Sequence, residues 1–211
     1  MNDEDEVVYV VDDDPAVRKG LARLLRSAGL TVATRASAAE FLALDHHQGV
    51  GCMVLDVRMP GVDGMAFQAR LAARGVDLPI VFLTGHGDIP MSVEAMKQGA
   101  VDFLTKPVDE EVLLAAVHQA LLRHRAGRTE REGARVARER VQSLTPRELD
   151  VLRCVITGAR NKRIAAHLGI AEKTVKLHRG RVMKKLGLTT VAELVQACRR
   201  AGIEPGTGLK T

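Results

Sequence analysis

The sequence predicts two domains of different class, an α/β domain followed by a smaller all-α domain. In the first half of the 211-residue chain, short continuous apolar runs alternate with stretches of helical periodicity, which is typical of parallel strands covered on both faces. From Leu144 onward the apolar spacing is helical throughout. The charge divides in the same way, because residues 1–125 carry a net charge of −6 and residues 126–211 carry +11. We therefore expect two domains with different binding partners.

Five apolar runs predict the strands of the first domain. Three are strong and two, the second and the fifth, are weaker; in chain order they cover residues 7–11, 30–33, 52–55, 80–83 and 101–104. Stretches of helical periodicity follow each of them, at about residues 17–25, 41–42, 65–71, 93–96 and 112–122. Five strands that alternate with five helices predict a doubly wound, five-stranded parallel sheet.

The next segment, residues 123–143, contains few apolar positions and many charges. This composition predicts a linker, for which a helical and an irregular conformation both remain open. We therefore divide the chain into a first domain of residues 1–122, a linker of residues 123–143 and a second domain of residues 144–211.

The second domain begins with a complete set of helix-start signals. Thr145 is the expected N-cap, Pro146 the first helical residue, and Glu148 the partner of Thr145 in a capping box. Three more helices are expected, at residues 161–167, 172–186 and 191–201. A glycine-containing turn joins the first two of these into a helix-turn-helix. On the 172–186 helix Val175, Val182 and Leu186 form one narrow apolar stripe, and the opposite side is mainly basic.

Composition excludes several classes of protein. The apolar runs are far shorter than the roughly 20 residues that cross a bilayer, and the acidic first residues differ from a signal peptide, so we expect a cytoplasmic protein without a membrane partner. Three widely spaced cysteines without metal-ligand spacing argue against a disulfide scaffold or a zinc finger. With one Tyr, four Phe and no Trp, the chain lacks a base-stacking platform, so any bound nucleic acid is expected to be duplex.

Polar residues follow the predicted strands at the edge where ligands bind to an open α/β sheet. Asp12 and Asp13 follow the first strand, Asp56 the third, Thr84 the fourth and Lys106 the fifth. Crowded carboxylates repel one another unless a hard cation lies between them, and Mg²⁺ takes oxygen ligands while leaving positions for a phosphoryl oxygen. Lys106 and Thr84 could contact other phosphoryl oxygens, and one carboxylate could be the nucleophile. The pattern is compatible with a Mg²⁺ site at which a carboxylate accepts a phosphoryl group.

Four segments resemble the receiver domain of two-component response regulators: residues 10–13, 54–64, 84–88 and 103–107. The resemblance covers about residues 6–122 and implies a CheY-like receiver fold. It also implies that Asp56 is the phosphoacceptor, that Lys106 contacts the phosphate, and that Thr84 and Phe103 form a switch pair.

The same resemblance implies the ligands of a Mg²⁺ cofactor. Asp13 would bind the ion directly, Asp12 would complete the acidic pocket, and Asp56 and the backbone carbonyl of Arg58 would be further ligands. The peptide bond between Lys106 and Pro107 is expected to be cis, because the family places a cis bond there and only X-Pro bonds adopt that form at low cost.

Other segments resemble the LuxR/FixJ-type four-helix DNA-binding domain: residues 145–152, 161–165, 174–178 and 185–187. This match covers about residues 143–203 and, with the receiver, indicates the FixJ subgroup. It implies that Lys176 and Leu177 enter the major groove, where a lysine can donate to guanine and a leucine can touch a thymine methyl. The rest of the expected DNA-binding set, mostly phosphate contacts, comprises Asn161, Lys162, Thr174, Arg179, Gly180, Arg181 and Lys184.

These expectations combine into a DNA-binding response regulator and not an enzyme. A sensor histidine kinase would phosphorylate Asp56, and the phosphorylated chain would form a homodimer that binds promoter DNA, with RNA polymerase as a further partner. Two alternatives remain open. One is a Mg²⁺-dependent phosphatase that uses Asp56 as its nucleophile, which leaves the basic half unexplained; the other is a DNA-binding protein whose receiver dimerises without phosphorylation.

Overall fold

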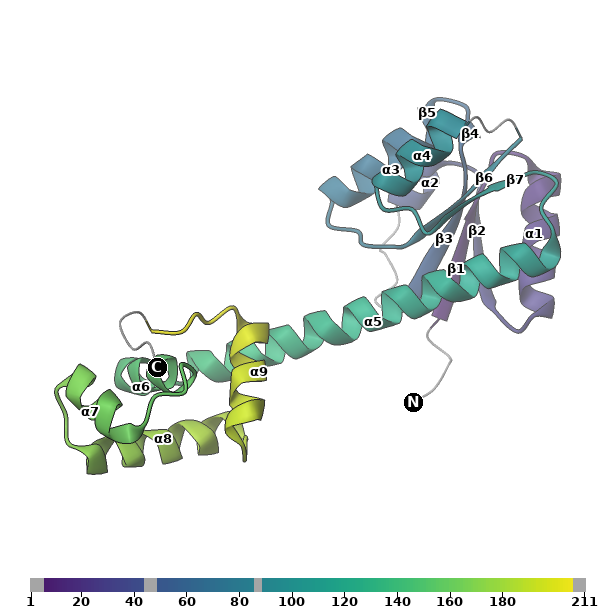
Figure 1. Ribbon diagram of the computed structural model, residues 1–211. Helices are drawn as coiled ribbons and strands as arrows, with labels where there is room; N and C mark the ends of the chain where they lie inside the picture. The colour runs from purple at the N-terminus through teal and green to yellow at the C-terminus, as the bar shows by residue number, and fades with distance from the viewer. Residues whose placement is uncertain (1–5, 44–48, 86–88, 207–211) are drawn as a thin grey trace. The chain divides into compact units, whose positions relative to one another are not determined.

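The computed structural model describes residues 6–43, 49–85 and 89–206, and it divides into two compact units, Met1–Arg128 and Thr129–Thr211 (Figure 1). The elements of the first unit are β1 (Glu6–Val11), α1 (Pro15–Ser27), β2 (Thr31–Arg35), α2 (Ala38–Leu42), β3 (Val50–Asp56), β4 (Arg58–Met59), β5 (Val62–Asp63), α3 (Gly64–Ala73), β6 (Ile80–Thr84), α4 (Ile89–Lys97) and β7 (Asp102–Thr105). Helix α5 (Glu110–Gln142) begins in the first unit and ends in the second, which also contains α6 (Pro146–Val155), α7 (Asn161–Leu168), α8 (Glu172–Leu186) and α9 (Val191–Ala201).

The first unit has the predicted doubly wound sheet. Its five strands lie in the order β2-β1-β3-β6-β7 and every neighbouring pair is parallel. The two weakly apolar runs of the sequence are the edge strands β2 and β7, which explains their composition: an edge strand is less completely covered than a central one. Both begin one residue later than the apolar pattern indicates, at Thr31 and Asp102.

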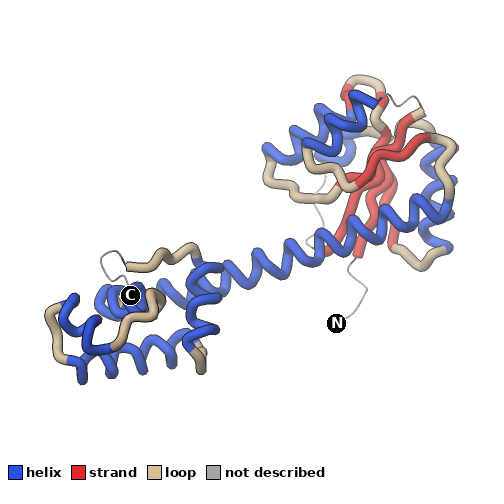
Figure 2. The backbone as a smooth tube through the Cα atoms, viewed as in Figure 1, coloured by secondary structure: helices blue, strands red, loops and turns tan. Residues whose placement is uncertain are grey.

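Helices cover both faces of this sheet (Figure 2). Val8 and Val10 of β1 lie in a cluster with buried residues of α1 and α5, whereas Tyr9 and Val11 lie in a second cluster with buried residues of α2 and α3. Successive strand residues point to opposite faces, so a strand covered on both sides must be apolar at every position. This requirement produces the continuous apolar runs seen in the sequence.

The carboxyl ends of the strands lead into capped helices. Asp14 is the N-cap of α1, where its carboxylate accepts hydrogen bonds from the backbone N–H groups of Ala16 and Val17, and Pro15 begins the helix. Of the three consecutive aspartates, Asp14 is therefore the one that caps the helix. Asp12 and Asp13 remain available for the edge of the sheet.

A short antiparallel hairpin, β4–β5, follows β3 and was not predicted, because two-residue strands are too short to show a periodicity. The hairpin returns the chain to Gly64, whose N–H donates to the carbonyl of Val57 at 2.8 Å. A Cβ added at Gly64 would lie 2.8 Å from the carbonyl oxygen of Asp56 and 3.0 Å from the Cα of Val57. Gly64 is thus the residue that lets α3 start directly against the end of β3.

Residues 123–142 of the expected linker are helical, because α5 continues without a break to Gln142. In this stretch the exposed side chain of Arg135 forms ion pairs with Glu132 and Glu139, at i,i+3 and i,i+4 spacing. Such pairs support a helix that buries little apolar surface. Near its end, α5 does bury Ala137 and Val141, which pack within the second unit.

The second unit has the four predicted helices in addition to the end of α5. The capping box of Thr145 and Glu148 is present, and Pro146 is the first residue of α6. Helices α8 and α9 have the predicted bounds, and each ends at a glycine in the left-handed conformation, Gly187 and Gly202. Buried residues from α5, α6, α7, α8 and α9 form one apolar cluster.

No helix among the described residues is both long enough and apolar enough to span a membrane. The three cysteines, Cys52, Cys154 and Cys198, are buried free thiols. Burial raises the pKa of the Cys52 thiol to about 12, so this side chain behaves as a small apolar group of the sheet.

Candidate phosphoryl-acceptor and DNA-binding sites

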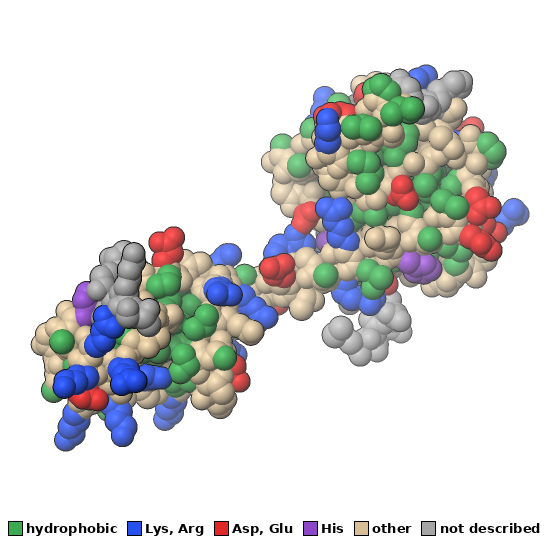
Figure 3. Space-filling model, in the orientation of Figure 1, with side chains coloured by type: hydrophobic (Ala, Val, Ile, Leu, Met, Phe, Trp, Pro, Cys, Tyr) green, Lys and Arg blue, Asp and Glu red, His purple; other side chains and the backbone are tan. Residues whose placement is uncertain are grey.

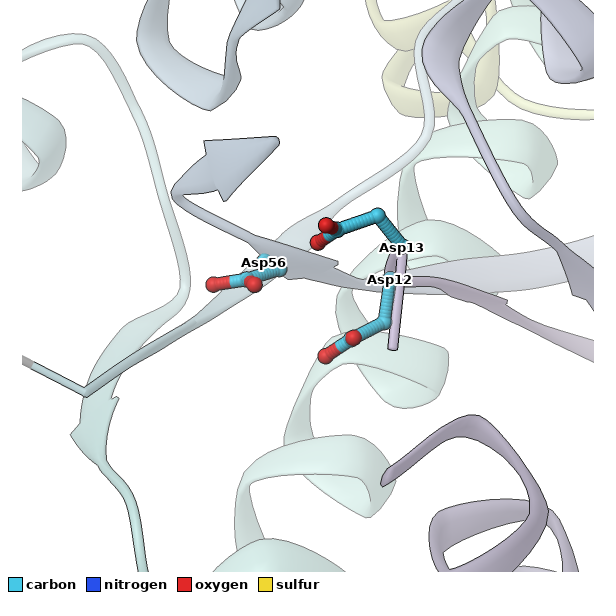
Figure 4. Close-up of side chains that lie close together, drawn as sticks. All are labelled: Asp12, Asp13 and Asp56. Atoms are coloured by element: carbon cyan, nitrogen blue, oxygen red, sulfur yellow. The ribbon is translucent and has the colours of Figure 1, made fainter. Parts of the chain in front are cut away.

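Three carboxylates meet at the carboxyl ends of β1 and β3 (Figure 4). Asp12, Asp13 and Asp56 each offer an oxygen atom, and these atoms lie within 4.8 Å of one another. Asp12 is 1% exposed and Asp56 is 8% exposed, whereas Asp13 is exposed to solvent. The parallel sheet brings Asp13 and Asp56 together across 43 positions of the chain, as the strand-end rule predicts.

One lysine serves two of these carboxylates. The Nζ atom of Lys106 lies 2.7 Å from Oδ2 of Asp12 and 3.2 Å from Oδ2 of Asp56. The lysine follows β7, its backbone N–H donates to the carbonyl of Thr84 at 2.7 Å, and its peptide bond to Pro107 is cis, as expected. The ammonium group thus bridges the two buried carboxylates and leaves Asp13 facing solvent.

Burial and ion pairing oppose one another at this site. Burial raises the pKa of Asp12, and the hydrogen bonds from Lys106 and from the N–H of Asp14 offset this only in part. Burial alone would lower the pKa of Lys106, but its contacts with Asp12 and Asp56 raise that pKa overall. With three carboxylates beside one ammonium, the site holds negative charge that Lys106 alone does not compensate.

Backbone and side-chain contacts fix the carboxylates in place. The Asp12 carbonyl accepts a hydrogen bond from Nη1 of Arg18 at 2.6 Å, and its Oδ1 accepts one from the N–H of Asp14 at 2.9 Å. Oδ1 of Asp56 accepts from the N–H of Arg58 at 3.3 Å. Arg58, which is expected to supply a carbonyl ligand, is the first residue of β4, and its backbone contacts the Asp56 side chain.

The donor set is compatible with Mg²⁺. Three carboxylates from two neighbouring strands offer only oxygen ligands, which hard cations prefer, and Asp13 is exposed to solvent. The net negative charge of three carboxylates and one ammonium favours binding of a further cation.

The expected switch residues lie on the adjoining strands. Thr84 ends β6, is fully buried and pairs in register with Thr105 of β7. Phe103 lies on the edge strand β7, is partly buried, and its ring centroid is 6.1 Å from that of Phe82. Residues 86–88 of the motif that begins at Thr84 lie outside the described residues.

The second candidate site is the outward face of α8. Val175, Val182 and Leu186 are buried, as their spacing predicts. Lys176 is exposed and Leu177 is 53% exposed, an unusual position for a large apolar side chain. The other exposed residues of this face are Lys173, Gly180, Arg181 and Lys184. In Figure 3, Lys and Arg side chains project from the side of this unit where Figure 1 places α8.

The remaining residues of the expected DNA-binding set lie nearby on α7 and α8. Lys162 is exposed, and Thr174 is half-buried at the start of α8. Nη1 of Arg179 donates to Oδ1 of Asn161 at 3.2 Å, so the two residues link α8 to α7. This bond holds Arg179 against the first turn of α7.

Two contacts of charged residues, which the sequence did not predict, join α8 to α6 and to α5. Nζ of Lys185 lies 2.6 Å from Oε2 of Glu148, a buried carboxylate of α6. The ion pair with Lys185 and the hydrogen bond from Thr145 lower the pKa of Glu148 to about 2. Arg140 of α5 donates to the carbonyl of Leu186. Partners 37 and 46 positions apart leave no periodic signal in a sequence.

Two family models match the chain, one in each unit. Residues 8–118 match the model "Response regulator receiver domain", and residues 142–198 match "Bacterial regulatory proteins, luxR family". Each match coincides with one of the two clusters of site residues. The acidic cluster lies in the first match and the basic face of α8 in the second.

The chain is similar to complete regulators along most of its length. Nodulation protein W of Bradyrhizobium diazoefficiens is 45% identical over 93% of this chain and 87% of that protein. The transcriptional regulatory protein FixJ of Azorhizobium caulinodans is 45% identical over 94% of each chain. Among solved structures, the response regulator StyR matches with a TM-score of 0.82 at 47% identity, over 93% of this chain and 99% of that one. The chain therefore belongs to the response regulators that join a receiver domain to a LuxR-type DNA-binding domain, and it is a regulator of transcription and not an enzyme.

Proposed function

We propose that a sensor histidine kinase transfers a phosphoryl group to Asp56, and that the phosphorylated chain dimerises and binds promoter DNA. The observation that carries this proposal is the shared lysine: Nζ of Lys106 lies within 3.2 Å of both Asp12 and Asp56. An ammonium group that already contacts the acceptor carboxylate can stabilise the negative charge of a phosphoryl group transferred to that carboxylate.

In the proposed step, a carboxylate oxygen of Asp56 attacks phosphorus while the bond from phosphorus to the kinase imidazole breaks, and the electron pair of that bond stays on the imidazole. Lys106 moves its ammonium from Asp56 toward the new phosphoryl oxygens and keeps its contact with Asp12. Asp12, Asp13, Asp56 and the Arg58 carbonyl would hold a Mg²⁺ ion, which would supply further neutralisation of the charge on the phosphoryl oxygens.

The proposed switch starts at Thr84. Its hydroxyl turns toward the phosphoryl group, and Phe103 moves inward on the edge strand in response. The face made by α4 and β7 changes as a result. This face suits a dimer because Ile89, Val93 and Met96 of α4 are 80%, 46% and 47% exposed.

Dimerisation then pairs two DNA-binding domains for half-sites about one helical turn apart. Lys176 and Leu177 read base edges in the major groove, while the surrounding basic residues contact phosphates. The functional division of the chain is a receiver of residues 1–122, a linker of residues 123–143 and a DNA-binding domain of residues 144–211, and RNA polymerase is the further partner.

Sedimentation of the full chain with Mg²⁺, with and without beryllofluoride as a phosphoryl mimic, tests the switch. We expect the wild type to shift from monomer to dimer and Asp56→Asn to stay monomeric. Asp109→Asn is the matched control, because this exposed aspartate caps α5 and asparagine caps equally well. A dimer shift in Asp56→Asn would contradict the assigned acceptor, and no shift in the wild type would contradict dimerisation on phosphorylation.

A further inference from the structure

The carboxyl end of α8 is held by three contacts within the second unit. Nη1 of Arg140, at the end of α5, donates to the carbonyl of Leu186 at 2.9 Å. In the opposite direction, Nζ of Lys185 donates to the carbonyl of Ser143 at 3.1 Å. The same ammonium pairs with the buried Glu148 of α6 at 2.6 Å. The last turn of α8 is therefore tied to both the end of α5 and α6.

These contacts satisfy a specific need of the helix end. The last carbonyls of a helix lack partners within the helix and carry a partial negative charge. The carbonyls of Met183 and Lys184 accept from the backbone N–H groups of Leu188 and Gly187, in the turn that ends α8. The carbonyl of Leu186 instead receives the guanidinium of Arg140. A charged donor at this point both completes the cap and fixes the direction of the helix.

The end of α5 is anchored well enough to hold that position. Val141 is 9% exposed and lies in the same apolar cluster as Leu186, and Ala137 is also buried. Glu148 is fixed in turn, because the N–H of Thr145 donates to it in the capping box. Both groups that hold the end of α8 are therefore attached to ordered parts of the unit.

We propose that Arg140 and Lys185 are positioning residues for DNA recognition: they hold the last turn of α8 so that its exposed first turns meet the major groove in one orientation. The inference rests on the proposed function, in which α8 reads the DNA. It separates two kinds of cation in a strongly basic domain. Lys176, Arg181 and Lys184 are exposed on the outward face of α8. Arg140 and Lys185 are exposed as well, but their side chains donate to groups of the protein itself.

Salt dependence distinguishes the two kinds of cation. The logarithm of the binding constant falls linearly with the logarithm of the salt concentration, and the magnitude of that fall is the salt slope. Each phosphate contact that a cation makes adds about 0.9 to the salt slope, because a counterion is released. A residue that only orients α8 changes the affinity at every salt concentration and leaves the slope as it is.

The test measures binding of the full chain to a duplex that the wild type has selected from a random library, between low and moderate salt. We expect Arg140→Ala and Lys185→Met to weaken binding roughly tenfold with an unchanged slope. Arg140→Lys, which keeps a charged donor, should recover part of the loss. Lys184→Ala, on the exposed face, should lower the slope by about 0.9. Arg138→Ala, an exposed arginine two positions before Arg140, is the control and should bind as the wild type does.

Three results would overturn the inference: an unchanged affinity in Arg140→Ala and Lys185→Met, a slope lowered by about 0.9 in either of them, or no recovery in Arg140→Lys. Hydrogen exchange of the last turn of α8 provides a second measurement, since Arg140→Ala should accelerate exchange there and Arg138→Ala should not. If Lys176→Ala and Lys184→Ala bind DNA like the wild type, the proposed role of α8 is wrong. The exchange rates would then still decide whether Arg140 holds the helix end.

Discussion

The two units place their charged groups in opposite ways. In the receiver, the groups proposed for function converge on the end of the sheet, where Asp12 is 1% exposed and Asp56 is 8% exposed. In the DNA-binding unit, the cations proposed for function are exposed on α8, and the buried carboxylate, Glu148, has a structural partner in Lys185. Buried charge thus marks the site in one unit and the scaffold in the other.

The difference lies in whether the buried charge is balanced. Glu148 has its own ammonium partner and a capping bond, and its pKa is lowered to about 2. Asp12 shares one ammonium with Asp56, and burial raises its pKa. A balanced pair stabilises a fold, whereas an unbalanced cluster remains ready to bind another cation or a phosphoryl group.

The largest effect expected from this comparison is stabilisation of the receiver by Mg²⁺. An ion that binds only the folded chain adds about 2.7 kcal/mol at a concentration roughly 100 times its Kd. The melting temperature of the wild type should therefore rise with added Mg²⁺, and Asp12→Asn should lose most of that increase. Glu148→Gln should keep it, because that carboxylate already has its partner. An equal response of Asp12→Asn and wild type would contradict the cation site.

Close packing at Gly64 gives the next largest effect. In Gly64→Ala the new Cβ would lie 2.8 Å from the Asp56 carbonyl oxygen and 3.2 Å from the Phe82 ring, so the backbone that carries Asp56 must shift. We expect a loss of about 1–3 kcal/mol in the free energy of unfolding, with slower phosphorylation. Gly85→Ala, at the same edge of the sheet with open space around it, is the control for chemical denaturation. A stability equal to that of the wild type in Gly64→Ala would show that the hairpin can move.

The strand-end carboxylates could be predicted from the sequence because each follows an apolar run, and parallel strands end at one edge of the sheet. The outward face of α8 could be predicted for a similar reason, since a helix period is a local pattern. The contacts that complete the sites could not. The bridge of Lys106 between Asp12 and Asp56, and the bond from Arg140 to Leu186, depend on how distant elements pack.

The ion pair of Glu148 and Lys185 should make the stability of the DNA-binding unit depend on pH. The pKa of Glu148 falls from 4.5 to about 2 on folding. A lowered carboxyl pKa contributes stability above pH 4.5, and this contribution is lost as the pH falls toward 2. The difference in melting temperature between wild type and Glu148→Gln should therefore be largest at neutral pH and shrink below pH 4.5. A difference that stays constant with pH would show that the ion pair contributes nothing to stability.

The smallest effects on the free energy of unfolding are expected at two glycines, Gly180 within α8 and Gly187 directly after it. Replacement by alanine should stabilise the unit at the first position and destabilise it at the second. Gly180 lies inside the helix and is exposed, and an added Cβ would meet no atom within 4 Å apart from its chain neighbours and the backbone of its own helix. Gly180→Ala should therefore stabilise the unit by about 0.5–1 kcal/mol. Gly187 ends the helix at φ +67°, where an L residue is strained, so Gly187→Ala should destabilise it by about 1 kcal/mol. Chemical denaturation of the two variants measures both. Because the Gly187 turn adjoins the carbonyl that Arg140 binds, Gly187→Ala should also weaken DNA binding without a change in salt slope, and a lowered slope would instead place that turn on the DNA.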